Sequence, residues 1–142
     1  MIQSVGSEAE FSLDSRLAAD CFLVTDMALS RVLLMNDSRY PWLILVPRRA
    51  NIREIHHLTP ENQTSLFEEM MRVSELLQTE FLPTKMNVGA LGNIVSQLHV
   101  HIIARNEGDP AWPGPVWGHS TASAYPDDRS EKLIEDLASK LG

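Results

Sequence analysis

Short apolar runs alternate with polar turns over the first third of the chain. The runs occupy residues 21–25, 32–35 and 42–46, and polar segments at 26–30 and 36–41 separate them. Apolar runs of this length, bounded by turn residues, are typical of β-strands. The spacing predicts a three-stranded antiparallel meander.

A long helix is predicted after the meander. Thr59 provides an N-cap, Pro60 suits the first helical position, and Glu61 follows where the helix dipole favours an acid. Because Pro83 disfavours the α conformation at Leu82, the helix is expected to end near that residue. Apolar residues recur at helical spacing, and we interpret them as core rather than as a cofactor-binding surface. They are Leu66, Phe67, Met70, Val73 and Leu77.

The C-terminal part combines an irregular segment with a short helix. Residues 108–126 hold half of the prolines and are expected to form an ordered surface loop, because Trp112, Val116 and Trp117 are poorly suited to water. Asp128 and Glu131 have capping-box spacing and precede apolar residues at helical periodicity, which predicts a short amphipathic helix within 128–141. A weaker pattern near residues 13–19 predicts a short N-terminal helix.

The most informative segment, residues 86–104, contains no Asp, Glu, Lys or Arg. It predicts a strand, a glycine-containing turn and a second strand at 98–104. Because side chains alternate along a strand, Gln97, His99 and His101 are expected on one face and the apolar residues between them on the other.

Two histidines after a turn that offers the backbone N–H groups of Gly92 and Asn93 suit an anion beside a nucleophilic ring. A neutral imidazole attacks phosphorus best when one nitrogen donates a hydrogen bond to a carbonyl group and the other keeps its lone pair outward. This chemistry would split a phosphoryl or nucleotidyl transfer into two steps. Two alternatives stay open: a strand face without catalytic function, and a zinc site that takes a third ligand from His56, His57 or His119.

Composition narrows the class of protein. The chain has 142 residues and a net charge of −7, which predicts one domain over residues 1–142 and disfavours nucleic acid as a partner. It has one cysteine, and neither a signal peptide nor a membrane-spanning run is visible, so we expect a cytoplasmic protein without membrane partners. The basic residues Arg48, Arg49 and Arg53 form either a solvated loop or a site for a small anion.

Residues 92–103 resemble the signature of the histidine triad (HIT) superfamily, in which three histidines alternate with apolar residues after a glycine and a polar residue. The resemblance implies an α+β, HIT-like fold with a five-stranded antiparallel sheet and one long helix, to which the predicted short C-terminal helix is added. It also implies a homodimer that hydrolyses or transfers nucleotides and needs no cofactor or metal.

The resemblance implies a role for several residues of this segment. His99 matches the nucleophile, and His101 matches the histidine that orients and polarises the site. Gly92 and Asn93 match the turn that contacts phosphate, and Asn87 matches a polar residue on the leaving-group side.

Upstream residues complete the expected nucleotide site. Asp37 matches an acid that holds the ribose hydroxyls, and Met35 and Leu34 would line the base pocket. Two residues depart from the family pattern. Gln97 takes the place of the first catalytic histidine and cannot shuttle a proton, and Trp42 stands where some members carry a further histidine.

Trp117 lies in a Trp- and Pro-rich segment similar to the tail of bacterial HIT-like hydrolases. It is a candidate for substrate selection at a partner's site, or a packed structural residue. We expect a hydrolase or nucleotidyl transferase that cleaves a P–N or P–O–P bond next to a nucleoside monophosphate through a nucleotidyl-His99 intermediate. Dinucleoside polyphosphates and nucleoside phosphoramidates are the expected substrates. The alternative function is a HIT-fold module that binds nucleotides with little or no turnover.

Overall fold

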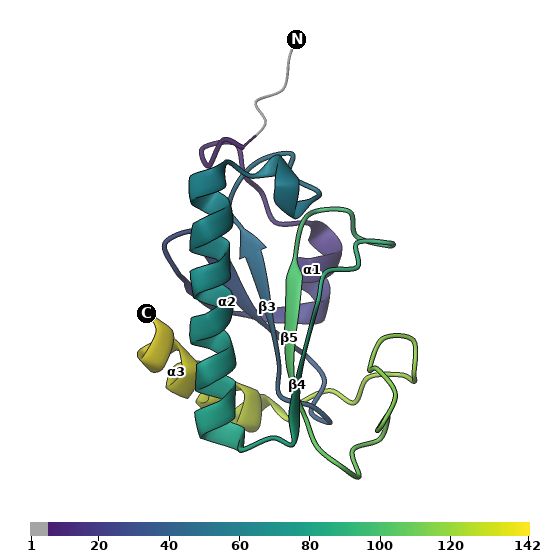
Figure 1. Cartoon of the computed structure of the whole chain (residues 1–142). Coiled ribbons are helices and arrows are strands. Elements are labelled where there is room, and N and C mark those ends of the chain that lie inside the picture. The colour runs from purple at the N-terminus through teal and green to yellow at the C-terminus, as the bar shows by residue number, and fades with distance from the viewer. Residues whose placement is uncertain (1–5) are drawn as a thin grey trace.

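Five strands pair in the order β1-β2-β3-β5-β4 and form one antiparallel sheet (Figure 1). The computed structural model describes residues 6–142. The strands are β1 (Cys21–Asp26), β2 (Ser30–Met35), β3 (Trp42–Pro47), β4 (Lys85–Gly89) and β5 (Val100–Arg105). The helices are α1 (Ser15–Asp20), α2 (Pro60–Phe81) and α3 (Asp127–Leu141), with a 3₁₀ turn η1 (Ile55–His57). The predicted α+β class, with a five-stranded antiparallel sheet, a long helix and a C-terminal helix, is confirmed.

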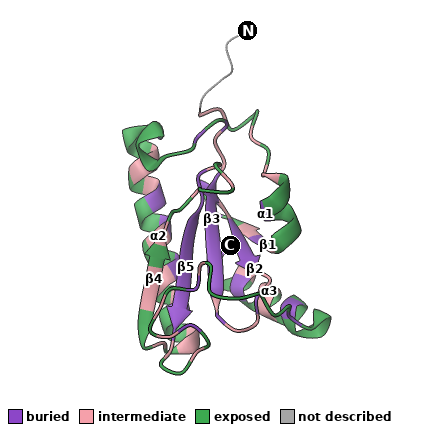
Figure 2. Cartoon of the chain, turned by 90° about the vertical axis from the view of Figure 1, so that its right-hand side faces the viewer, coloured by how far each residue is buried: buried purple, intermediate pink, exposed green. Residues whose placement is uncertain are grey.

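The two faces of the sheet are covered by different layers. On one face α2 packs against β5 and β3, α3 packs against β1, and both helices share a single hydrophobic core with the sheet. On the other face a second core joins Leu17 of α1 and Val116 of the C-terminal loop to Ile44 and Ile103. Figure 2 shows β3 and β5 buried between these layers and β4 more exposed at the edge.

The ends of α2 agree with the prediction. The Thr59 hydroxyl oxygen accepts the backbone N–H of Asn62 and caps the first turn. Leu82 follows the last helical residue in the left-handed conformation, with φ at 47°. Its position before Pro83 disfavours the α conformation and stops the helix there.

The inward face of α2 differs from the predicted stripe at one turn. Leu66, Val73 and Leu77 are buried as expected, but Phe67 is 59% exposed. Glu69 is buried instead, although the helical pattern assigns it to solvent. The prediction that Phe67 widens the core stripe is therefore wrong.

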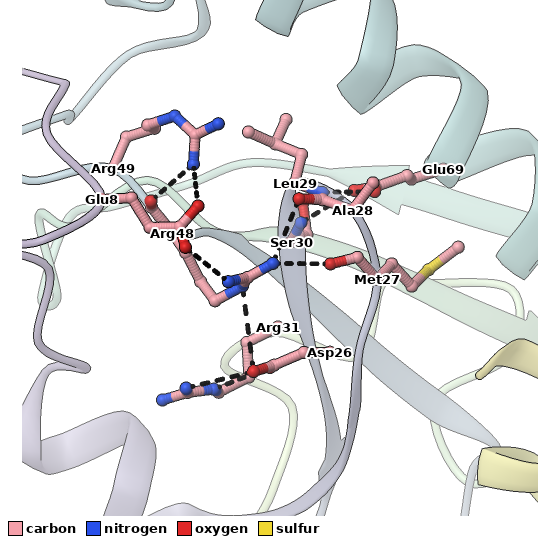
Figure 3. Close-up of polar contacts among 10 residues, drawn as sticks. All are labelled: Glu8, Asp26, Met27, Ala28, Leu29, Ser30, Arg31, Arg48, Arg49 and Glu69. Carbon is pink, nitrogen blue, oxygen red and sulfur yellow. Dashed lines mark hydrogen bonds and ion pairs between the residues drawn. The ribbon is translucent and has the colours of Figure 1, made fainter.

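The buried carboxylate of Glu69 holds the turn between β1 and β2. It accepts the backbone N–H groups of Leu29 at 2.8 Å and Ser30 at 3.0 Å (Figure 3). Both donors are buried, so each would be costly to leave without an acceptor. The Glu69 side chain thus fastens the first hairpin to the long helix through two hydrogen bonds from the hairpin main chain.

The basic residues after β3 also serve the fold. Arg48 donates to the carbonyl oxygens of Met27 at 2.6 Å and Ala28 at 3.1 Å (Figure 3). Arg48 and Arg49 both form ion pairs with Glu8, at 3.2 and 3.1 Å. Instead of forming a site for a small anion, these two arginines tie the N-terminal segment and the hairpin turn to the end of β3.

The second strand of the glycine–histidine segment is shorter than predicted. It begins at Val100, and residues 90–99 form a loop rather than a tight turn and the start of a strand. Leu98 donates its backbone N–H to the carbonyl of Ile52, which lies beyond the end of β3. Leu98 is buried in the core under α2 and His99 lies beside His101, so the alternation of side chains continues before the first residue of β5.

Both terminal helices are present with shifted boundaries. α1 begins after Asp14, whose carboxylate accepts the backbone N–H of Arg16. α3 has Pro126 as its N-cap and no side-chain cap, so the predicted capping box of Asp128 and Glu131 does not start it. No helix within residues 6–142 is long and apolar enough to cross a membrane.

Candidate functional site

His99 and His101 lie together on the face of the sheet that carries the second core. In the sheet register His101 lies opposite Ile44 of β3 and Gly89 of β4, and His99 directly precedes β5. The two ring centroids are 4.9 Å apart, and both residues are buried. The structure thus brings together the two histidines that the alternation pattern assigns to one face.

The orientation of the His99 ring is fixed by a main-chain carbonyl two residues earlier in the chain. Its Nδ1 lies 2.7 Å from the carbonyl oxygen of Gln97. A carbonyl oxygen can only accept, so Nδ1 carries the proton and donates. In the neutral ring the lone pair is then on Nε2, which is the arrangement that nucleophilic attack on phosphorus requires.

His101 has the opposite tautomer, because its Nδ1 accepts a hydrogen bond instead of donating one. The indole N–H of Trp42 donates to Nδ1 of His101 at 3.0 Å, so the proton of the neutral ring is on Nε2. Burial, together with the nearby His99, lowers the pKa of His101 from 6.5 to about 4. His101 is therefore a neutral hydrogen-bond donor at physiological pH.

Trp117 covers His101 from the C-terminal loop of the same chain. The two ring centroids are 5.4 Å apart in an edge-on arrangement. A Cβ atom on Gly89 would lie 3.0 Å from the edge of the Trp117 indole, so the glycine leaves the space that the ring occupies. The indole Nε1 is buried and has no hydrogen-bond partner. Trp117 thus packs within its own chain, as expected for the alternative of a packed structural residue, and its role in substrate selection at a partner's site stays a prediction.

The side chain of Gln97 is used away from the two rings. Its Oε1 accepts the backbone N–H of Asp14 at 2.9 Å, and its Nε2 donates to the carbonyl of Ser12 at 2.9 Å. Both ends of the amide therefore hold the segment before α1. Gln97 therefore contacts His99 through its main-chain carbonyl, whereas its side chain, expected to take the place of the first histidine, binds the segment before α1.

Asn87 is oriented by Arg105, a buried residue that sequence reasoning missed. Arg105 donates to Oδ1 of Asn87 at 2.8 Å, forms a two-point ion pair with Asp109 at 2.8 and 2.9 Å, and donates to the carbonyl of Gly114 at 2.9 Å. The amide group of Asn87 thus presents its N–H donors to other partners. The only available signal was that Arg105 is the first charged residue after the uncharged segment.

Asp37 is hydrogen-bonded both by nearby Arg39 and by Ser123 from the loop before α3. Its carboxylate is almost fully buried and accepts two hydrogen bonds from the Arg39 guanidinium, both at 2.9 Å, and one from the backbone of Ser123 at 3.4 Å. Burial alone would raise the pKa of Asp37, but these hydrogen bonds hold it below its ordinary value. A ribose would have to replace some of these donors.

The two residues expected to line a base pocket point to opposite faces of β2. Leu34 is buried in the core under α2 and α3, whereas Met35 packs beside the core that faces His101. The assignment of Leu34 to the pocket is therefore wrong, because strand alternation separates it from Met35. Gly92 adopts a φ of +73° in the loop before β5, and Asn93 next to it is exposed.

The metal hypothesis needs a third ligand beside the histidine pair. Within residues 6–142, no group of three or more His, Cys, Asp or Glu side chains is arranged to hold a metal ion. His56 and His57 contact each other edge-on just before α2, and His119 contacts Ser120 in the C-terminal loop. The described residues therefore do not supply the ligand set that zinc requires.

Comparison with known proteins identifies the fold. Residues 16–108, about two thirds of the chain, match the HIT domain. The chain is 46% identical to a histidine triad (HIT) protein from Sinorhizobium meliloti, with a TM-score of 0.91 and coverage of 95% of this chain and 100% of that one. It is 47% identical to a histidine triad protein from Marinobacter aquaeolei, with a TM-score of 0.90 and coverage of 92% and 96%.

A curated relative carries the name of an enzyme. The asymmetrical bis(5'-nucleosyl)-tetraphosphatase of Schizosaccharomyces pombe is 31% identical over 72 residues. The match covers 47% of this chain and 39% of that protein, so the chain spans about two fifths of the length of the curated relative.

Proposed function

Because the chain belongs to the HIT domain family, we propose that it hydrolyses or transfers nucleotides through a covalent intermediate on His99. The bond cleaved is a P–N or P–O–P bond next to a nucleoside monophosphate. The observation that carries the proposal is the hydrogen bond from Nδ1 of His99 to the Gln97 carbonyl, which leaves a lone pair on Nε2. The name of the yeast relative supports dinucleoside polyphosphates as one substrate class.

The reaction has two steps. In the first, Nε2 of His99 attacks the phosphorus of the nucleoside monophosphate unit, a P–N bond to the ring forms, and the leaving group departs with the electron pair of the broken bond. The Nδ1 proton stays on the ring and continues to donate to the Gln97 carbonyl. In the second, water attacks the phosphorus, the pair returns to Nε2, and a proton is released to solvent.

Neighbouring donors bind the phosphate in this proposal. The Nε2–H of His101 donates to a phosphate oxygen, and the turn at Gly92 and Asn93 adds main-chain and amide donors. The amide of Asn87, whose Oδ1 accepts a hydrogen bond from Arg105, is assigned to the leaving-group side in this proposal. Asp37 is assigned to the ribose in exchange for part of its bonding to Arg39.

We also propose that the chain forms a single domain and pairs as a homodimer. β4 is an edge strand, and the apolar residues on it and on the following loop are exposed: Val88, Leu91 and Ile94. α2 adds exposed Phe67 and Met71. An unpaired strand edge beside exposed apolar side chains is a liability that a second copy would cover.

The test is turnover of P1,P4-di(adenosine-5') tetraphosphate by wild type, His99→Ala and the control His56→Ala. His56 is exposed and lies outside the site. We expect His99→Ala to lose turnover and to keep nucleotide affinity within about tenfold, because the ring supplies the covalent step but only part of the phosphate contact. His56→Ala should match wild type.

Mass spectrometry of quenched wild-type reactions should show a mononucleotide on His99, in the presence of a chelator as well as without it. Wild-type rates in His99→Ala would contradict the mechanism. Nucleotide binding without turnover in the wild type would favour the binding module instead.

A further inference from the structure

The contact between Trp42 and His101 restricts what His101 can do. An indole N–H can only donate, so Nδ1 of His101 has to remain an acceptor while the 3.0 Å hydrogen bond exists. A charged ring would carry protons on both nitrogens and would set two N–H groups against each other. The contact therefore selects the neutral form, in agreement with the burial of the ring.

The side chains in contact with the two rings include none that could protonate a leaving group. Within the described chain, their hydrogen bonds and ring contacts involve Gln97, Trp42, Trp117 and each other. Amide and indole side chains do not titrate near neutral pH. The Gln97 amide is in addition bound at both ends by the segment before α1.

A leaving group at this site must therefore depart without general-acid help from these side chains. The oxygen of a phosphoric anhydride leaves as a stable phosphate anion, with the electron pair of the broken P–O bond. The nitrogen of a phosphoramidate has to gain a proton before or while the P–N bond breaks, because an amide anion is far too basic to leave. General-acid help is worth about a hundredfold to ten-thousandfold where a reaction needs it.

Building on the proposed nucleotidyl transfer at His99, we propose that Trp42 is a positioning residue that holds His101 as the neutral Nε2–H tautomer and thereby makes the site selective for P–O–P over P–N bonds. Within the described chain, the contacts of Trp42 with the histidine pair are to His101 and not to His99. Trp42 acts by denying His101 a second proton.

The first test compares two substrates that share one nucleoside monophosphate unit. Wild-type protein is assayed with P1,P4-di(adenosine-5') tetraphosphate and with adenosine 5'-phosphoramidate. We expect kcat/KM for the tetraphosphate to exceed that for the phosphoramidate by about a hundredfold or more, the lower bound of general-acid help. Equal turnover of both substrates, with the nucleotide captured on His99, would overturn the selectivity while leaving the proposed function intact.

The second test removes the donor. Trp42→Phe keeps an aromatic ring but frees Nδ1 of His101, so the ring can take up a second proton or change tautomer. We expect the ratio of tetraphosphate to phosphoramidate turnover to fall by roughly tenfold or more, as proton transfer becomes available. Tyr40→Phe is the matched control, because Tyr40 packs edge-on against Trp42 and its buried hydroxyl has no partner. It should leave the ratio unchanged, and an unchanged ratio in Trp42→Phe would contradict the proposal.

A third measurement does not depend on turnover. Nitrogen-15 NMR of the imidazole rings should show His101 of the wild type with its proton on Nε2 only, and a mixed population in Trp42→Phe. A proton on Nδ1 of His101 in the wild type would refute the proposal even if neither substrate reacts. Absence of turnover and of a His99 adduct, with the NMR result as expected, would refute the proposed reaction and with it the selectivity, and would leave only the hydrogen bond.

Discussion

Acidification should destabilise the protein through His101. The pKa of His101 in the folded chain, about 4, lies below its ordinary value of 6.5, so folding favours the neutral ring. The stabilisation is complete above pH 6.5 and is lost as the pH falls through this range toward 4. At about 1.4 kcal/mol for each pH unit, the loss by pH 4 amounts to about 3 kcal/mol. That is a large part of the 5–15 kcal/mol that is typical of a folded domain.

The contribution of His101 is isolated by comparison with His101→Asn. The asparagine side chain has an oxygen that can accept the Trp42 N–H, but it carries no titrating group. The free energy of unfolding is measured by urea titration at several pH values between 4 and 7. We expect wild type to lose about 3 kcal/mol more than His101→Asn over this interval.

Ile44→Val provides the control, because Ile44 lies opposite His101 in the sheet register and does not titrate. It should lower stability by about 1 kcal/mol at every pH, without changing the slope. The reasoning is refuted if wild type and His101→Asn lose stability in parallel.

Two further predictions concern the N-terminal segment and the assembly. Gln97→Ala removes the side-chain hydrogen bonds to Ser12 and Asp14 but keeps the main-chain carbonyl that holds His99. Amide hydrogens near residue 14 should therefore exchange faster, while the nucleotidyl-His99 adduct should still form. Loss of the adduct would show that the Gln97 side chain has a catalytic role. Light scattering should give about twice the chain mass of 15.9 kDa, and a monomer at all concentrations would contradict the homodimer.

The elements that the sequence predicts well are those set by local patterns. α2 is bounded by Thr59 and Leu82 because capping and the following proline act within a few residues. The start of β5 is not set locally. Leu98 and His99 continue the alternation of the strand, but the ladder with β3 begins only at the pair Leu45 and Val100. Pairing partners, which alternation does not reveal, decide where the strand begins.

The candidate site divides in the same way. The spacing of His99 and His101 predicts that they share a face, and the structure places their rings together. The donor on His101 is 59 positions away along the chain, and the partners of the Gln97 amide are 83 and 85 positions away. No periodicity links residues so far apart, so the tautomer of His101 required the structure.

The bond between His99 and the Gln97 carbonyl bears on how related proteins are recognised. Every amino acid carries a main-chain carbonyl, so this bond places no requirement on the side chain at position 97. A search pattern that demands histidine at the first position of the motif would discard chains whose second histidine is oriented in the same way. A pattern built on the second and third histidines, with the residue at the Trp42 position left variable, would keep these chains. The residue found at the Trp42 position would then indicate which tautomer the third histidine takes.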